Sequence, residues 1–150
     1  MKKILLVFGI LLALAVFLLA FTSRSSVRYA GGSLTGDSRQ IETYAKKFLE
    51  DIQFKDFQTA ASYHSKEDRK TVDIPNLIER LFGIKPEFLN IMRFDIVKVQ
   101  IDSTGKRARV LCHSVVKILN SNEIKEPEIM LYFRKDPAEG WVMELQSSLR

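Results

Sequence analysis

The sequence predicts an α+β protein, in which an N-terminal transmembrane helix precedes about three helices packed on a curved, four-stranded antiparallel sheet. Three observations predict this fold class. Residues 4–21 contain no charged or hydrogen-bonding side chain, as a membrane span requires. Residues 38–90 repeat apolar positions at helical spacing, whereas residues 91–147 alternate apolar and polar positions as strands do. Helices that all precede the strands are typical of the α+β class.

The N-terminal apolar run, residues 4–21, is long enough to cross a membrane. As a helix it extends about 27 Å, close to the thickness of the hydrocarbon core of a bilayer. A cleaved signal peptide has a shorter apolar region and a small-residue cleavage site, which Ala20-Phe21-Thr22 matches poorly. We therefore expect an uncleaved signal anchor in the lipid bilayer, with secretion after cleavage as the alternative.

The basic residues on either side of this run bear on its orientation. Lys2 and Lys3 favour a cytoplasmic N-terminus, although Arg24 and Arg28 lie close to the other end of the run. Because the N-terminal tail is so short, we expect a single-pass membrane protein whose C-terminal domain is extracytoplasmic.

Composition divides the remainder into a linker and a domain. Residues 22–37 are rich in Ser and Gly and form a flexible linker, and residues 38–150 form the folded domain. Four bases and one acid of the chain's 23 Lys and Arg and 18 Asp and Glu lie in residues 1–37, so the domain has a net charge of only +2. A nucleic-acid partner requires more positive charge. The single cysteine, Cys112, leaves too few thiols for a disulfide framework or a zinc finger, and we expect no metal or cofactor.

Three helices are expected at the start of the domain. Ser38 can cap the first, whose apolar face carries Ile41, Ala45, Phe48 and Ile52 at steps of four, three and four. A second helix carries Phe57, Ala60, Ala61 and His64 after a break at residues 54–56. A third follows Pro75 and stops near Gly83.

Four strands follow, at about residues 91–102, 107–120, 128–135 and 141–147. Residues 103–106 and 136–140 supply turns, so consecutive strands pair antiparallel. The alternation of the first strand changes phase, and a β-bulge near Ile96 and Val97 accounts for this change. The inner face of the other strands is expected to carry Val110, Cys112, Ser114, Val116, Ile129, Leu131, Phe133, Trp141, Met143 and Leu145.

The order of these elements resembles a known superfamily. The helix at residues 44–52, the break and the helix entering with Phe57 and Ala61 resemble the start of nuclear-transport-factor-2-like (cystatin-like cone) domains. The closing stretch, residues 139–145, resembles the last strand of that superfamily. The resemblance covers residues 39–147. It implies a cone-shaped α+β fold, and it leaves function open because the superfamily includes both enzymes and non-catalytic extracytoplasmic domains.

The resemblance also implies where a ligand would bind, between the helices and the sheet. The polar candidates for such a cavity are Tyr63, His64, Asp95, Cys112 and Ser114. Each has an ordinary alternative, since His64 can contact the last carbonyls of a helix and a buried thiol acts as a small apolar group. No carboxylate or histidine occupies the expected inner face of the last three strands, so we expect no catalytic residue.

The outer face of the sheet is the second candidate site. It is more apolar than a solvated face needs to be, since it carries Leu111, His113, Val115, Met130, Tyr132 and Val142. Either a partner binds there, or the C-terminal tail or a helix of the same chain covers these residues. The first hypothesis is therefore a membrane-anchored extracytoplasmic binding or assembly module without evident catalytic machinery, which binds a protein partner or a second copy. The alternative is a small-molecule-binding protein or an enzyme that uses the cone cavity.

Overall fold

The structure is a computed structural model that describes residues 36–144. The predicted anchor, residues 4–21, lies outside the described residues, as do residues 22–35 of the predicted linker and the end of the predicted last strand. Among the described residues, no helix is both long enough and apolar enough to span a bilayer.

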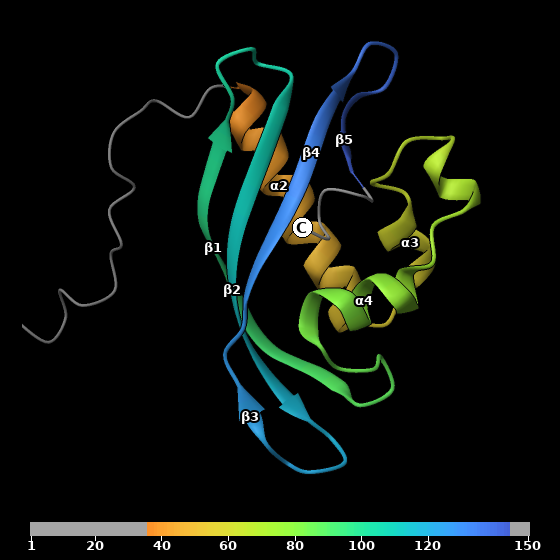
Figure 1. The fold of residues 1–150 in the computed structure, drawn as a ribbon, viewed down its shortest axis with the longest axis vertical. Coiled ribbons are helices and arrows are strands. Elements are labelled where there is room, and N and C mark those ends of the chain that lie inside the picture. The colour runs from red at the N-terminus through yellow and green to blue at the C-terminus, as the bar shows by residue number, and fades with distance from the viewer. Residues whose placement is uncertain (1–35, 145–150) are drawn as a thin grey trace, which may run out of the picture. The chain divides into compact units, whose positions relative to one another are not determined.

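Within residues 36–144, three α-helices and a short 3-10 helix precede the sheet (Figure 1). Helix α2 comprises Gly36–Gln53 and begins two residues before the predicted cap at Ser38. Helix α3 comprises Phe57–Ala61, and the Asp56 side chain accepts a hydrogen bond from the Thr59 amide at its start. The 3-10 helix η2 comprises Asp68–Lys70. Helix α4 comprises Ile74–Phe82 and ends at Gly83, as predicted.

One predicted helix boundary is wrong. Helix α3 ends at Ala61, so His64 lies three residues beyond it rather than in its last turn. His64 instead forms an isolated parallel β-bridge with Met143. Only the tertiary structure supplies Met143 as a partner, so local spacing gives no sign of this pairing.

The sheet contains the four predicted antiparallel strands in the order β1-β2-β4-β5, and a fifth, β3, that was not predicted. The bounds are Leu89–Ile101 (β1), Arg107–Ile118 (β2), Ile124–Lys125 (β3), Glu128–Asp136 (β4) and Gly140–Met143 (β5). Strand β3 pairs with β2 beyond the end of β4. Pro127 lies between them, and its carbonyl accepts a hydrogen bond from the Ser114 amide at 3.0 Å.

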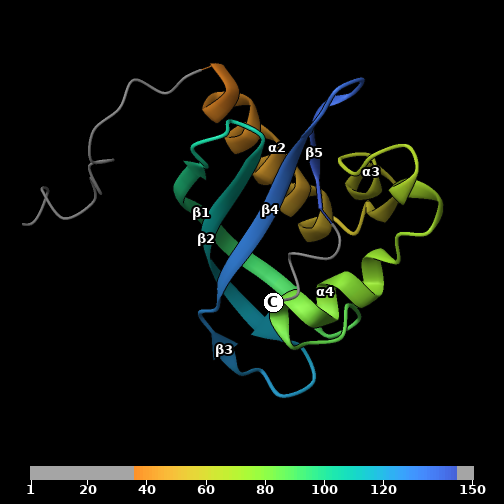
Figure 2. The ribbon, with the colours of Figure 1, turned by 45° about the horizontal axis from the view of Figure 1, so that its top comes forward.

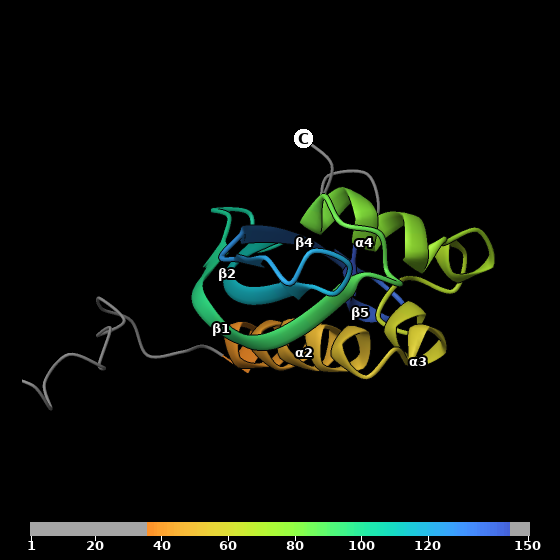
Figure 3. The ribbon, with the colours of Figure 1, turned by 90° about the horizontal axis from the view of Figure 1, so that it is seen from below.

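Strand β1 contains the predicted bulge. Its register against β2 shifts between Ile96 and Lys98, and a second shift, which was not predicted, lies between Ile91 and Arg93. Bulges bend a strand and increase its twist. In Figure 3 the sheet is strongly curved, and β1 wraps toward α2.

The hydrophobic core lies between the helices and the inner face of the sheet. Every described residue that was predicted to face inward from the last three strands is buried. Phe48 of α2 is also buried, whereas Phe57 is only half-buried against the core. Helices α3 and α4 lie on the β5 side of the sheet (Figures 1 and 2).

Candidate functional site

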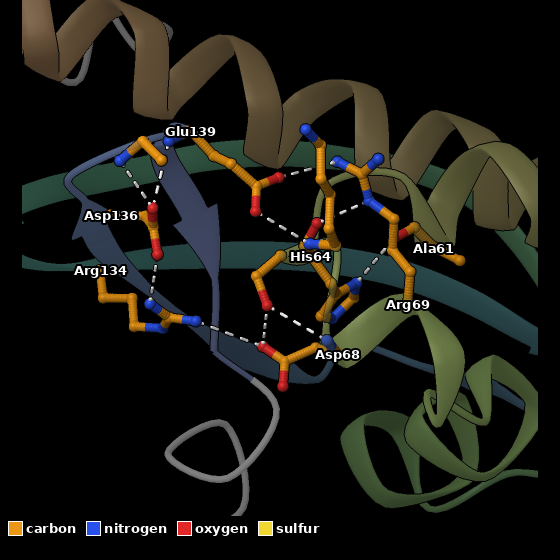
Figure 4. Close-up of polar contacts among 10 residues, drawn as sticks. Ala61, His64, Asp68, Arg69, Arg134, Asp136 and Glu139 are labelled. Atoms are coloured by element: carbon orange, nitrogen blue, oxygen red, sulfur yellow. Dashed lines mark hydrogen bonds and ion pairs between the residues drawn. The ribbon is translucent and has the colours of Figure 1, made fainter.

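The polar contacts between helices and strands concentrate where residues 62–72, the post-α3 segment, meet the hairpin of β4 and β5 (Figure 4). The backbone amide of Met143 donates to the Tyr63 carbonyl at 2.8 Å. The Arg69 Nε donates to the His64 carbonyl at 2.8 Å. The post-α3 segment is therefore held to the edge of the sheet through its backbone, at the position of His64.

Ion pairs surround this backbone junction. Arg134 lies 3.5 Å from the Asp68 carboxylate and 3.0 Å from that of Asp136. Arg69 lies 3.7 Å from Glu139, which also accepts from the Lys66 amide at 3.1 Å. All of these side chains are partly exposed to solvent, so each pair contributes little to stability by itself.

His64 is buried at the centre of this junction. Its Nδ1 lies 3.3 Å from the Ala61 carbonyl, and because a carbonyl can only accept, Nδ1 carries the proton of the neutral ring. Its Nε2 has no hydrogen-bond partner among residues 36–144. The edge of the ring meets Phe48, with centroids 6.2 Å apart. Burial lowers the pKa of His64, so the ring is neutral at pH 7.

Ser65, His64 and Asp68 are the residue types of a hydrolase triad, but their geometry differs from one. Ser65 Oγ donates directly to the Asp68 carboxylate at 2.8 Å and accepts from the Asp68 amide at 3.2 Å. A nucleophilic serine needs a hydrogen bond to its base, and no such bond joins His64 to either side chain within residues 36–144. These contacts shape the turn before η2.

Two of the predicted cavity residues, Cys112 and Ser114, are buried on the inner face of β2 but lie far from His64. His64 is opposite Met143, and the register continues from Met143 through Phe133 to Ala108. Cys112 and Ser114 follow Ala108 by four and six residues, or about 13 and 20 Å along the strand. Burial raises the pKa of the Cys112 thiol to about 12. The structure therefore does not bring these side chains together with His64.

Asp95 does not belong to a cavity. It is paired with His113 in the ladder between β1 and β2, its side chain is 68% exposed, and it lies 3.9 Å from Arg93. Its pairing with His113, between the two register shifts of β1, places it on the outer face, and the phase of the sequence pattern alone did not determine this direction.

Tyr63, one of the predicted cavity residues, lines a hollow beside the β4–β5 hairpin. This hollow of about 210 Å³ is lined by Tyr44, Ser62, Tyr63, Arg69, Glu139, Trp141 and Val142. Burial, together with the nearby Asp51 carboxylate, raises the pKa of Tyr63 to about 12. A larger groove of about 600 Å³ lies between α4 and residues 85–87, and one of about 410 Å³ lies over Arg109 and Tyr132.

The outer face of the sheet carries the predicted apolar side chains. Leu111 and Met130 are direct partners across β2 and β4, and Tyr132 is opposite Arg109. We define the outer patch as the half-buried residues Leu111, His113, Val115, Met130 and Tyr132. The inclusion of Val142 was wrong, because it is only 3% exposed. It lines the same hollow as Ser62, Tyr63 and Arg69, so the post-α3 segment shields it.

No group of three His, Cys, Asp or Glu side chains within residues 36–144 is arranged to hold a metal ion. Searches of protein-family models, curated proteins and solved structures gave no match to the chain.

Proposed function

We propose that this chain is a membrane-anchored extracytoplasmic binding or assembly module of nuclear-transport-factor-2-like architecture, which contacts a protein partner through its outer patch. The observation that carries the proposal is the position of the accessible apolar side chains. They lie side by side on the outer face of β2 and β4, whereas the interior candidates Cys112 and Ser114 lie far from His64.

The apolar surface extends past the outer patch toward β1 and β3. Val115 is paired with Arg93, and Met92, in the bulge beside Arg93, is 52% exposed. Ile124 of β3 is paired with Lys117 and is 57% exposed. Aromatic and methionine side chains are enriched at protein interfaces, and this surface includes Tyr132 and Met130.

Charged residues border the outer patch with both signs. Lys98 is paired with Leu111, and Arg109 with Tyr132, whereas Asp95 and Glu128 flank His113. His113 itself lies 3.4 Å from Glu126. A rim of mixed sign favours a protein partner over a polyanion such as nucleic acid, because a polyanion would be repelled by the carboxylates.

The alternative function, binding of a small molecule, has one observation in its favour. Tyr63 lines a hollow together with a charged pair, Arg69 and Glu139. This hollow of about 210 Å³ is smaller than the roughly 300–1,000 Å³ of typical ligand sites, so it supports ligand binding at Tyr63 less well than the outer patch supports binding of a protein.

The experiment is a paired substitution in the full-length chain, purified from membranes in detergent. Tyr132→Asp with Val115→Asp introduces two charges into the outer patch, and we expect it to abolish self-association and co-purification of partners. The matched control is Phe54→Asp with Leu119→Asp, which charges two exposed apolar residues outside the patch. Sedimentation and cross-linking measure association, and circular dichroism verifies folding. Equal association of both double variants and the wild type contradicts the proposal.

A further inference from the structure

We propose that His64 is a pH-sensitive latch, which holds the post-α3 segment on the edge of β5 while the ring is neutral and releases that segment when the ring is protonated. This device is independent of the proposed function, because it concerns only the junction between the segment and the β4–β5 hairpin.

The first basis for the latch is the enclosure of the imidazole. The ring is fully buried, and its Nδ1 already faces the Ala61 carbonyl at 3.3 Å. Protonation from solvent adds a second N–H at Nε2, where no acceptor lies among residues 36–144. An unpaired N–H on a buried cation is costly, so the protonated ring is stable only if it reaches water.

The second basis is the backbone on either side of the ring. The Tyr63 carbonyl accepts from Met143, and the His64 carbonyl accepts from Arg69. The whole of His64, backbone included, is 0% exposed, so the ring reaches water only when the segment itself moves away from the hairpin. The bonds that tie the segment to β5 and that organise η2 are therefore broken by the same movement.

The charged groups around the ring do not offer the protonated form a direct partner. In the segment itself, the field of Asp68 favours the cation and that of Arg69 opposes it. The Asp68 carboxylate is engaged by Ser65 and Arg134.

On the β4–β5 hairpin, Arg134 is paired with Asp136, and Glu139 is paired with Arg69. Helix α2 presents the apolar ring of Phe48. The charged side chains named on both sides of the junction are thus paired with one another rather than with the ring. The charge of the ring is therefore free to change with pH.

Release of the segment uncovers two buried side chains of β5, Trp141 and Val142, which line the hollow beneath Tyr63 and Arg69. Trp141 is the chain's only tryptophan, and Cys112, in the centre of the sheet, is its only cysteine. The protein therefore contains one reporter of local opening at β5 and one reporter of unfolding of the whole sheet.

The test uses the full-length chain in detergent between about pH 7.5 and 5.5, a range centred on the ordinary pKa of histidine. Acrylamide quenching of Trp141 fluorescence and hydrogen exchange at the Met143 amide measure opening. Labelling of Cys112 with a dithiodipyridine, which reacts in acid, measures global unfolding. We expect the equilibrium constant for opening to rise by up to about tenfold per pH unit, the limit for one proton, while Cys112 stays protected.

Two variants assign the effect to the ring. His64→Phe keeps an aromatic ring and cannot be protonated, so we expect quenching and exchange to become independent of pH. Phe54→His, which places a titratable ring at a position that is 79% exposed, is the control and should open as the wild type does. The proposal is overturned if the wild type does not open on acidification, if Cys112 becomes labelled in parallel, or if His64→Phe opens as the wild type does. If His64→Phe does not fold, a ring titration of His64 by NMR that fails to coincide with opening overturns it equally.

Discussion

The backbone amide of Met143 donates a 2.8 Å hydrogen bond to the carbonyl of Tyr63, and this bond joins the last strand to the segment that follows α3. Strand β5 has only four residues and pairs with β4 on one side. The parallel bridge on its other side occupies an edge that would otherwise present unpaired backbone groups. One bond of long sequence separation therefore completes the sheet and encloses His64.

The buried position of Phe48 predicts a large effect of truncation on stability. Phe48→Ala should lower the free energy of unfolding by about 3–5 kcal/mol, because it leaves a cavity between α2 and the sheet. Phe54→Ala is the control, since Phe54 is 79% exposed and its loss should change stability by less than about 0.5 kcal/mol. Chemical denaturation of both variants measures the two changes in unfolding free energy. Equal losses of stability would show that Phe48 does not belong to the core.

The lowered pKa of His64 predicts how stability depends on pH. The unfolded chain binds a proton as pH falls through 6.5, the ordinary value, whereas the native ring binds it only at lower pH. The free energy of unfolding should therefore be constant above this range, decline as pH falls below 6.5, and level off below the native pKa. Denaturant titrations between about pH 8 and 5 measure it. A decline of equal size in His64→Phe would assign it to another group.

The buried thiol of Cys112 predicts low chemical reactivity. Burial raises its pKa to about 12, so the reactive thiolate is scarce at pH 8, and the sheet excludes reagents. We expect alkylation by iodoacetamide at pH 8 to be slower than in denaturant by at least about a hundredfold, the order of magnitude expected when reaction requires opening of the sheet. Rapid alkylation of the native chain at Cys112 would show that β2 is accessible.

The parts of the fold that sequence predicted are those set by local chemistry. The four-three-four spacing from Ile41 to Ile52 and the stop at Gly83 predicted helices that the structure confirms. The change of phase at Ile96 predicted the bulge, because inward and outward positions can exchange only where an extra residue is inserted. Alternation along β2 and β4 likewise assigned the inner face correctly.

The features that sequence missed depend on contacts between distant segments. The bridge from His64 to Met143 joins residues that no pattern relates, and the burial of Val142 follows from the same segment. The residues predicted to line one cavity do not lie together, for a related reason. Residue types suggested Cys112 and Ser114 as neighbours of His64, but only the strand register shows how far along β2 they lie.

The left-handed backbone of Gly83 predicts the effect of a substitution at the end of α4. Its φ is +65°, which a residue with a Cβ adopts at a cost, so Gly83→Ala should lower stability by about 1 kcal/mol. Gly36→Ala is the matched control, because Gly36 has open space around it and no positive φ, and a helix favours Ala. The melting temperatures of the two variants measure their changes in stability. An equal loss of stability in both contradicts this account of Gly83.

The apolar run at residues 4–21 predicts that the mature protein keeps its N-terminal segment. Its length suits a bilayer, and Ala20-Phe21-Thr22 is a poor site for signal peptidase. We expect the intact mass of protein extracted from membranes to include these residues, and alkaline carbonate to leave the protein in the membrane fraction. The double substitution Leu12→Lys with Val16→Lys should release the protein from the membrane fraction. Each charge at the centre of a span opposes insertion into the bilayer by roughly 2.5–3.5 kcal/mol. Lys46→Leu with Lys47→Leu, on the exposed side of α2, is the control and should not change the fractionation. A mature N-terminus near Ser23 would instead establish secretion after cleavage and leave the domain without an anchor.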